Sequence, residues 1–501
     1  MNPLEAAELV ADQFEVSDAA LQQCVHQFIQ ELNEGLAHDQ PTMCQIPTYI
    51  TRVANGTEKG FSLAVDLGGT SLKICSVDLH GDSKFDLQES DLVIPSNLTV
   101  SQKASDLFGF IAAEVRGFLE DHHADRLRRA SGKGGRPLSL GFCFSFPVRQ
   151  ASVNSGVLLR WVKGFDIPDA VGKDVCQLLQ EELDRMEVPV KVNAIVNDTL
   201  GTLMTRAYTL PVDKTRTSVG AVFSNGTNGA YLEQLGKVSK DIGVHDTSTG
   251  EMFLSTEWGS FDQRVAVLSN TEYDQEIAQY GVDKDTQMFE KRMSGVFLGE
   301  LLRIAIERMY DNPKLGFFPN YKRGDKNLNL RQRWSVEASM LSVAEGSDTK
   351  NMTKKIEETF GFPGWAVTLQ DTRAVQMVSR AIGRRAARLA GMAVAAVILQ
   401  SGQLERNDSL VQPAPEGKAG RRESELNAES RMVDVAVDGN VFEMYPRFEV
   451  YMREAFRAID GIGRDGEKRI RIGLAKNGSS IGSAIVALLA AEQDGTNGAA
   501  V

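Results

Sequence analysis

Apolar positions along the chain alternate between a period of two and a period near 3.6, which predicts strands and helices in succession. Residues 18–36 follow the helical period behind Asp18, which we expect to be the N-cap. Residues 61–67 and 71–78 have the alternation and the β-branched content of strands, and the glycines between them predict a tight hairpin turn. The next predicted elements are a strand at 138–146, a helix near 171–186, a strand at 190–196 and a helix from about 199. This order is typical of α/β architecture with mixed sheets.

Two long helices are predicted in the second half of the chain, over residues 290–309 and residues 372–399. The second is almost wholly apolar near its end, so we expect it to be buried. Residues 121–137 are polar, basic and rich in Gly, which predicts an exposed loop. Residues 404–431 are rich in Pro, Glu, Ser, Asn and charge, which predicts a disordered surface insertion.

Length, charge and cysteine usage limit the class of protein. At 501 residues, the chain is too long for one ordinary hydrophobic core, so two lobes are expected. The formal net charge of -12 argues against a nucleic-acid-binding surface, because neutralising phosphates needs clustered Lys and Arg. Five scattered cysteines favour buried thiols in a reducing compartment. The first 18 residues resemble neither a signal nor a transit peptide, and the longest apolar run, residues 389–399, is too short to cross a bilayer. We therefore expect a cytoplasmic protein with no membrane span.

The first candidate site is the run Asp66-Leu-Gly-Gly-Thr70 at the end of a predicted strand. Two glycines let backbone N–H groups approach an anion closely, the hydroxyl adds a donor, and the carboxylate can orient Mg²⁺ through water. The alternative is a hairpin turn without a ligand.

Three further segments have both a catalytic and a structural interpretation. Asp198 follows a predicted strand, where a general base can project from a rigid element, but an Asp or Thr there is also a common helix N-cap. The Gly-rich run 224–229 can hold phosphate or simply join two strands. The run 478–482 opens a helix, where free N–H groups favour an anion, and its glycines equally suit close helix packing.

The order of these segments is more specific than any one of them. It is similar to the duplicated nucleotide-binding fold that sugar kinases share with actin and the chaperone ATPases. Residues 140–147, 160–167 and 197–202 resemble the sugar-site segments of hexokinases, and fungal glucokinases and hexokinases are the most similar. Further matching segments are 256–262, 289–291 and 294–301.

The resemblance implies a two-lobed, duplicated ribonuclease H-like fold of the actin-like ATPase and hexokinase type, an α/β fold with mixed sheets and a cleft between the lobes. The large lobe is expected to comprise residues 1–62 and 198–473, with the insertion at 404–431. The small lobe is expected to comprise residues 63–197 and 474–501.

The resemblance also implies the residue roles. Hexose hydroxyls would be bound by Ser145, Lys163, Asn197, Asp198, Glu257 and Glu290. Asp198 would accept the proton of the 6-hydroxyl as it attacks the γ-phosphoryl group of ATP, with Lys163 as the second catalytic residue. The nucleotide would be bound by Asp66, Gly68, Gly69, Thr70, Ser71, Lys73, Gly226, Thr227, Gly478 and Ser479. No direct protein ligand to metal is implied, because Mg²⁺ arrives with ATP and meets Asp66 through water.

Several residues depart from the family pattern, mostly on the nucleotide side. They are Ser71-Leu-Lys73 in place of Asn-Phe-Arg, Val162 in place of Thr, Ser224-Asn225-Gly226 in place of Gly-Thr-Gly, Asn440 in place of Ser, and Asn477-Gly-Ser-Ser480 in place of Asp-Gly-Ser-Gly. Each donor lost from a buried phosphate contact costs about 1–3 kcal/mol.

Two functions remain open from the sequence. The first is an ATP-dependent hexose 6-phosphotransferase that acts on glucose or a related hexose, in the first step of glycolysis. The second is a sugar-binding regulatory protein with weak or no activity, for which residues 404–431 offer a site for a partner protein. An ATPase without sugar chemistry is disfavoured by the segments around Ser145, Lys163 and Asp198.

Overall fold

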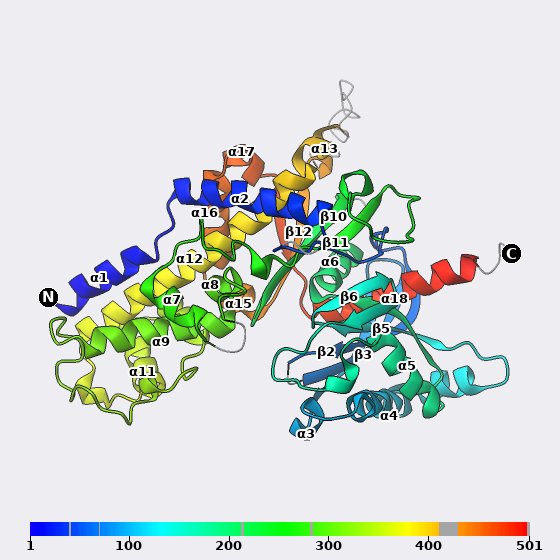
Figure 1. The fold of residues 1–501 in the computed structure, drawn as a ribbon, viewed down its shortest axis with the longest axis horizontal. Coiled ribbons are helices and arrows are strands. Elements are labelled where there is room, and N and C mark those ends of the chain that lie inside the picture. Colours follow the sequence, from blue (N-terminus) through cyan, green and yellow to red (C-terminus); the bar gives the residue numbers. More distant parts are fainter. Residues whose placement is uncertain (40–41, 70, 212–214, 281–283, 410–428, 498–501) are drawn as a thin grey trace.

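Two mixed β-sheets lie in separate halves of the molecule (Figure 1). The computed structural model describes residues 1–39, 42–69, 71–211, 215–280, 284–409 and 429–497. The five-stranded sheet has the order β4 (Phe85–Val93), β3 (Ser71–His80), β2 (Lys59–Leu67), β5 (Leu138–Phe144) and β8 (Val190–Val196). The six-stranded sheet has the order β1 (Ile46–Pro47), β11 (Glu251–Ser255), β10 (Thr227–Gln234), β9 (Thr217–Phe223), β12 (Val433–Asp438) and β13 (Ile470–Leu474). β6 (Val148–Ser152) and β7 (Ser155–Leu158) form a separate ribbon.

The two sheets repeat one pattern of pairing. In the first sheet β4, β3 and β2 are antiparallel neighbours, and β5 and β8 then continue in parallel with β2. In the second sheet β11, β10 and β9 are antiparallel neighbours, and β12 and β13 continue in parallel with β9. β1 adds one strand at the edge of the second sheet. This repetition confirms the predicted duplicated α/β fold with mixed sheets.

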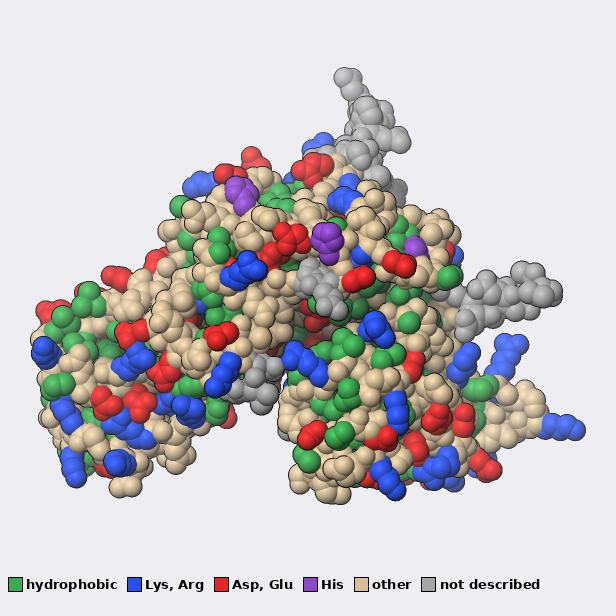
Figure 2. Space-filling view, in the orientation of Figure 1, with side chains coloured by type: hydrophobic (Ala, Val, Ile, Leu, Met, Phe, Trp, Pro, Cys, Tyr) green, Lys and Arg blue, Asp and Glu red, His purple; other side chains and the backbone are tan. Residues whose placement is uncertain are grey.

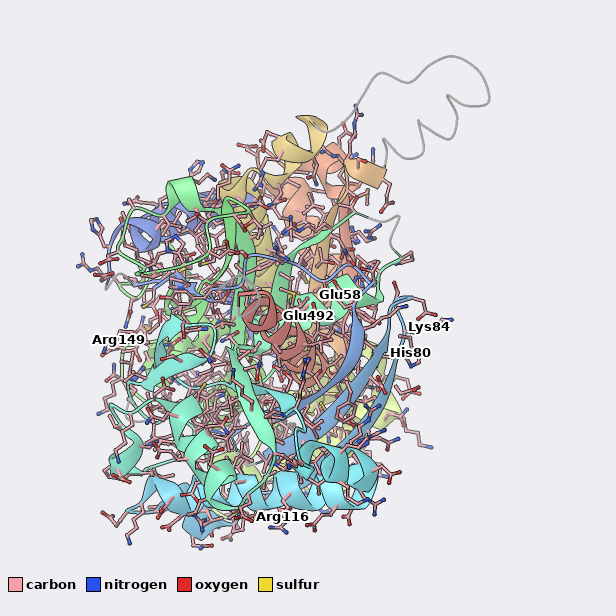
Figure 3. All side chains as sticks on the ribbon, turned by 90° about the vertical axis from the view of Figure 1, so that its right-hand side faces the viewer. Glu58, His80, Lys84, Arg116, Arg149 and Glu492 are labelled. Atoms are coloured by element: carbon pink, nitrogen blue, oxygen red, sulfur yellow. The ribbon has the colours of Figure 1, made fainter. Side chains whose placement is uncertain are left out.

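Two helices separate the sheets. α18 (Gly478–Asn497) packs on β2, β5 and β8, and α6 (Asp198–Thr209) packs on α18 and on β9. Figure 3 views α18 nearly along its axis, with Glu492 between the two halves of the molecule. The helices approach closely, since a Cβ added at Gly482 would lie 1.9 Å from the carbonyl oxygen of Gly201. The structural interpretation of residues 478–482, close helix packing, is therefore confirmed.

The other helices cover the outer faces and build the larger core. α4 (Ala104–Ser131) and α5 (Val175–Arg185) cover the outer face of the five-stranded sheet. In the other half, α12 (Leu369–Ser401) is buried along most of its length, as predicted, and lies against α1 (Pro3–Gln13), α2 (Asp18–Ala37) and α16 (Phe448–Ala458) (Figure 1). The remaining helices of that half include α7 (Glu272–Ala278), α8 (Glu290–Met293), α9 (Gly295–Asp311), α10 (Ser339–Gly346), α11 (Thr349–Phe360), α13 (Gln403–Ser409), α15 (Asn440–Met444) and α17 (Gly463–Glu467).

The predicted loop at 121–137 is wrong over most of its length, because α4 continues to Ser131. The helix bends at His123, whose Nε2 lies 2.7 Å from the hydroxyl of Ser76. One turn later, Arg126 lies over the ring of Phe61 and donates to Asp78. These contacts to the sheet hold a polar segment in helical form, and no local pattern in the sequence reveals them.

Three other expectations are corrected. The N-cap of α2 is Ser17 rather than Asp18, since the Ser17 hydroxyl accepts from the N–H of Ala20. The helix predicted over residues 290–309 is interrupted at Ser294, where the backbone is extended. The insertion predicted at 404–431 begins as the helix α13, and only residues 410–428 of it lie outside the described residues.

Candidate active site

The carboxyl ends of parallel strands bring the predicted site residues to one edge of each sheet. β2, β5 and β8 run in parallel, so Asp66, Ser145 and Asp198 lie at the same edge. In the second sheet β9 and β12 are parallel, which brings Ser224 and Asp438 to the corresponding edge. Ligands of open α/β sheets bind at such edges. The surface is hollowed between the two halves (Figure 2).

Asp198 is the first residue of α6 and directly follows the cap. Asn197 is the N-cap, because its side-chain oxygen accepts from the backbone N–H of Thr199 at 2.9 Å. The carboxylate of Asp198 is therefore not the N-cap acceptor. Burial, together with the negative charges of Asp66 and Glu257, raises the pKa of Asp198 to about 6, although the nearby ammonium of Lys163 lowers it. A carboxylate with this pKa is suited to accept a proton near neutral pH.

Lys163 connects two of the predicted segments. Its backbone is left-handed, with φ of 58°, and its ammonium donates to the carbonyl oxygen of Ser145 at 2.9 Å. A Cβ at Gly69 would lie 3.7 Å from the Cβ of Lys163, so the first glycine-rich turn is adjacent. Trp161 and Phe165 stack beside it, with ring centroids 5.3 Å apart. This aromatic packing holds the segment that carries the cation.

Glu257 is held by a residue that the sequence analysis did not single out. Its carboxylate accepts from the Asn228 amide at 2.7 Å and from the Ser255 hydroxyl at 2.9 Å. The Asn228 side-chain oxygen accepts from the backbone N–H of Glu257 at 3.0 Å and from the hydroxyl of Thr256 at 3.1 Å. Glu257 has a left-handed backbone, with φ of 56°, so these contacts fix an unusual conformation. The only sequence signal is the position of Asn228 in the Gly-rich run 224–229.

Glu290 begins α8 and faces the Gly-rich turn. Burial raises the pKa of Glu290 to about 6, opposed by the backbone N–H of Thr227 and by the charge of Lys163. That N–H donates to the carboxylate at 3.0 Å, and a Cβ at Gly226 would also lie 3.0 Å from it. The Thr227 hydroxyl accepts from the indole N–H of Trp258 at 3.0 Å. The predicted nucleotide residues Gly226 and Thr227 therefore contact a predicted sugar residue.

The charges of Asp198, Lys163, Glu257 and Glu290 lie close enough to act on one another, so the structure brings these four predicted sugar residues near each other. Three carboxylates and one ammonium provide acceptors and donors for the vicinal hydroxyls of a polyol. Ser145 lies at the end of β5 and Asn197 at the end of β8, on the same edge.

The predicted nucleotide residues fall into two groups. In the first group the Asp66 carboxylate accepts from the hydroxyls of Ser479 at 2.6 Å and Ser480 at 3.1 Å. The N–H of Gly68 donates to the carbonyl oxygen of Ser71 at 2.9 Å, which closes the hairpin turn. Thr70 lies outside the described residues. The second group is Gly226 and Thr227, beside Glu290.

A carboxylate accepts a hydrogen bond from the first residue of α18. The N–H of Gly478 donates to Asp438 at 2.9 Å, and burial raises the pKa of that acid. Gly439, the next residue, has φ of 110°, and a Cβ there would lie 2.3 Å from the carbonyl oxygen of Phe223. Only glycine fits this position, so β9 and β12 remain close where both strands end.

Among the described residues, no group of three or more His, Cys, Asp or Glu side chains is placed to hold a metal ion. Within the same residues, every helix is too short or too polar to cross a membrane. The carboxylate of Asp66 has two hydroxyl neighbours and lies at a strand end, an arrangement that fits an ion reached through water.

The chain has a duplicated α/β fold and a site lined by carboxylates. Comparisons with known proteins identify the family. Two family models, both described as hexokinase, match residues 6–208 and 218–489. A glucokinase of Aspergillus niger is 44% identical over 98% of this chain and 98% of its own. Glucokinase-1 of Saccharomyces cerevisiae is 35% identical over 97% of each chain. The chain belongs to the hexokinase family.

Solved structures agree with this assignment. The hexokinase of Schistosoma mansoni complexed with glucose is 28% identical and has a TM-score of 0.78, covering 97% of this chain and 99% of its own. The fold is therefore the two-domain hexokinase fold, as the sequence predicted.

Proposed function

We propose that this chain transfers the γ-phosphoryl group of ATP to the 6-hydroxyl of glucose or a related hexose. The observation that carries the proposal is the partly buried Asp198, with a pKa of about 6, on a rigid strand–helix junction beside Lys163, Glu257 and Glu290. Relatives named glucokinase and a structural neighbour that contains glucose support the choice of substrate. We propose the cytoplasm as its location and glycolysis as its pathway.

In this proposal the hexose lies between Asp198, Glu257 and Glu290, whose carboxylates accept from its hydroxyls. Lys163, Ser145 and Asn197 complete the contacts. Asp198 takes the proton of the 6-hydroxyl, the oxygen attacks the γ-phosphorus in line, and the bond from that phosphorus to the β-phosphate oxygen breaks, so that ADP leaves. Phosphoryl transfer depends mainly on positioning and on neutralising charge, which the fixed strand ends favour.

The nucleotide is proposed to lie at the adjoining strand ends. Contacts are assigned to Asp66, Gly68, Gly69, Thr70, Ser71, Lys73, Gly226, Thr227, Gly478 and Ser479. Mg²⁺ would neutralise phosphate charge, and Asp66 would hold it through water. The lobe boundaries, 1–62 with 198–473 and 63–197 with 474–501, are proposed on the same basis, and they are supported by the placement of α6 and α18 between the sheets.

A coupled assay with Mg-ATP and glucose tests this function directly. Formation of glucose 6-phosphate is the expected result, and calorimetry with glucose alone gives binding separately. Tight glucose binding without any turnover would contradict the proposal.

The pH profile is expected to fall on the acid side. Asp198 acts only when it is deprotonated, and its pKa is raised to about 6, so kcat/KM decreases as the pH falls through about 6. Glu290 has a raised pKa in the same range, which makes the fall steeper than tenfold per pH unit. Initial rates between pH 5 and pH 8 measure this, and a flat profile down to pH 5 would refute the assignment.

Asn228→Ala is expected to raise the KM for glucose by about tenfold, because Glu257 loses the amide that orients it. Steady-state kinetics with varied glucose measure the change. Asn33→Ala, on the exposed face of α2, is a matched control that should leave the KM unaltered. An unaltered KM in the Asn228 variant would show that Glu257 does not need this support.

A further inference from the structure

Lys73 stands in a row of alternating charges across three strands. In the β2–β3 hairpin it is directly opposite Asp66, and across the β3–β4 pair it is directly opposite Asp91. Directly opposed side chains of antiparallel strands lie on the same face of the sheet. The ammonium is therefore placed between an acid of the proposed nucleotide site and an acid of the outermost strand.

The contacts of the Lys73 ammonium lie on the β4 side of this row. It is 3.5 Å from the Asp91 carboxylate and 3.6 Å from that of Glu89. It also donates to the side-chain oxygen of Asn477 at 3.4 Å, and the amide of Asn477 donates to Glu89 at 3.3 Å. Lys73, Glu89 and Asn477, from β3, β4 and the residue before α18, close a polar ring, and Asp91 pairs with Lys73 beside it.

Asn477 has an unusual backbone conformation in addition to its side-chain contacts. Its backbone is left-handed, with φ of 55°, which Asn tolerates better than most residues. It immediately precedes Gly478, the first residue of α18. The ring thus connects the edge strand of the sheet to the start of a helix whose Ser479 contacts Asp66. Two of the family departures noted in the sequence, Lys73 and Asn477, are direct neighbours.

We propose that Glu89, Asp91 and Asn477 form a latch that holds Lys73 away from the nucleotide until its phosphates displace the two acids. This inference rests on the proposed function, because it assumes that the nucleotide lies beside Asp66. Glu89 and Asp91 are positioning residues, since they act through Lys73. The side chains of Lys73, Glu89 and Asp91 are 21%, 37% and 63% exposed, so each ion pair is partly hydrated and opens readily.

The double variant Glu89→Gln with Asp91→Asn tests the latch. Calorimetry with Mg²⁺ and a non-hydrolysable ATP analogue should show binding tightened by about threefold to tenfold, because two weak ion pairs no longer compete for the ammonium. The glucose affinity should stay unchanged, which also verifies folding. Asp86→Asn is the matched control, since it removes a carboxylate from the same strand whose contact is to His80.

Removing two carboxylates also makes the region less negative, and a second variant separates that effect from the latch. Lys73→Met should weaken analogue binding more in the Glu89→Gln, Asp91→Asn background than in the parent, because in the parent part of the phosphate contact of the ammonium is offset by the two ion pairs it must give up. Equal effects of Lys73→Met in both backgrounds would show a general field effect and overturn the latch. Unchanged or weaker analogue binding in the double variant would overturn it as well.

Failure of the latch and failure of the proposed function give different results. If the double variant binds the analogue more tightly but no glucose 6-phosphate forms, the latch is supported and the proposed kinase activity is contradicted. If glucose is phosphorylated rapidly but the double variant binds the analogue as the parent does, the activity is supported and the latch is contradicted. In an active enzyme, the latch predicts a lower KM for ATP in the double variant at the same kcat.

Discussion

Asp198→Asn is expected to lower kcat for glucose phosphorylation by about 100-fold to 10,000-fold while glucose still binds. The amide keeps the shape of the side chain but cannot accept the proton of the attacking hydroxyl. Because Asn197 rather than Asp198 is the N-cap of α6, the substitution leaves the helix start intact. The coupled assay measures kcat, and calorimetry with glucose measures binding.

A matched control for this prediction is Asp184→Asn on the exposed face of α5, where the carboxylate accepts from the side-chain amide of Gln180 on the same helix. That variant should keep the parent rate, which shows that loss of one negative charge is not the cause. A rate for Asp198→Asn within tenfold of the parent would contradict the assignment of the base.

Gly482→Ala is expected to lower the free energy of unfolding by about 1–3 kcal/mol, although Ala is the better helix former. The added Cβ would lie 1.9 Å from the carbonyl oxygen of Gly201 and 2.4 Å from its carbon. Both are backbone atoms, so the collision is relieved only if α6 and α18 move apart. Urea unfolding followed by circular dichroism measures the change.

Gly117→Ala is the matched control for the helix packing. Gly117 lies inside α4, and a Cβ there meets no atom within 4 Å. This variant should be more stable than the parent by about 0.5–1 kcal/mol, because Ala has less backbone entropy to lose than Gly. Similar stabilisation of both variants would show that α6 and α18 are not closely packed.

The sequence predicted the elements whose pattern is local. Residues 190–196 were expected as a strand and form β8 with the same bounds, because Val190, Val192, Ala194 and Val196 give the strand one continuous, buried apolar face. The hairpin around Gly68 followed from two alternating runs and a pair of glycines. The long helix α12 followed from its apolar periodicity, and its boundaries moved by only two or three residues.

The sequence also indicated the family, because the segments around Ser145, Lys163 and Asp198 resemble hexokinase motifs and the comparisons show the family directly. The sequence pattern indicated Glu257 but not Asn228. The two residues are 29 positions apart, and only folding brings the Asn228 amide to the Glu257 carboxylate. The roles of these residues stay predictions that the kinetic variants test.

Only the tertiary structure decided features that depend on distant partners. α4 continues beyond residue 121 because Ser76 and Asp78 of β3 bond its polar side chains. The contacts of Lys73 could not be predicted from the sequence either, because its hydrogen-bond partner Asn477 is 404 residues away in the chain. Local periodicity and motif likeness therefore determined the elements, the family and the candidate base. Long-range hydrogen bonds and ion pairs, which no short segment encodes, decided how those residues are held.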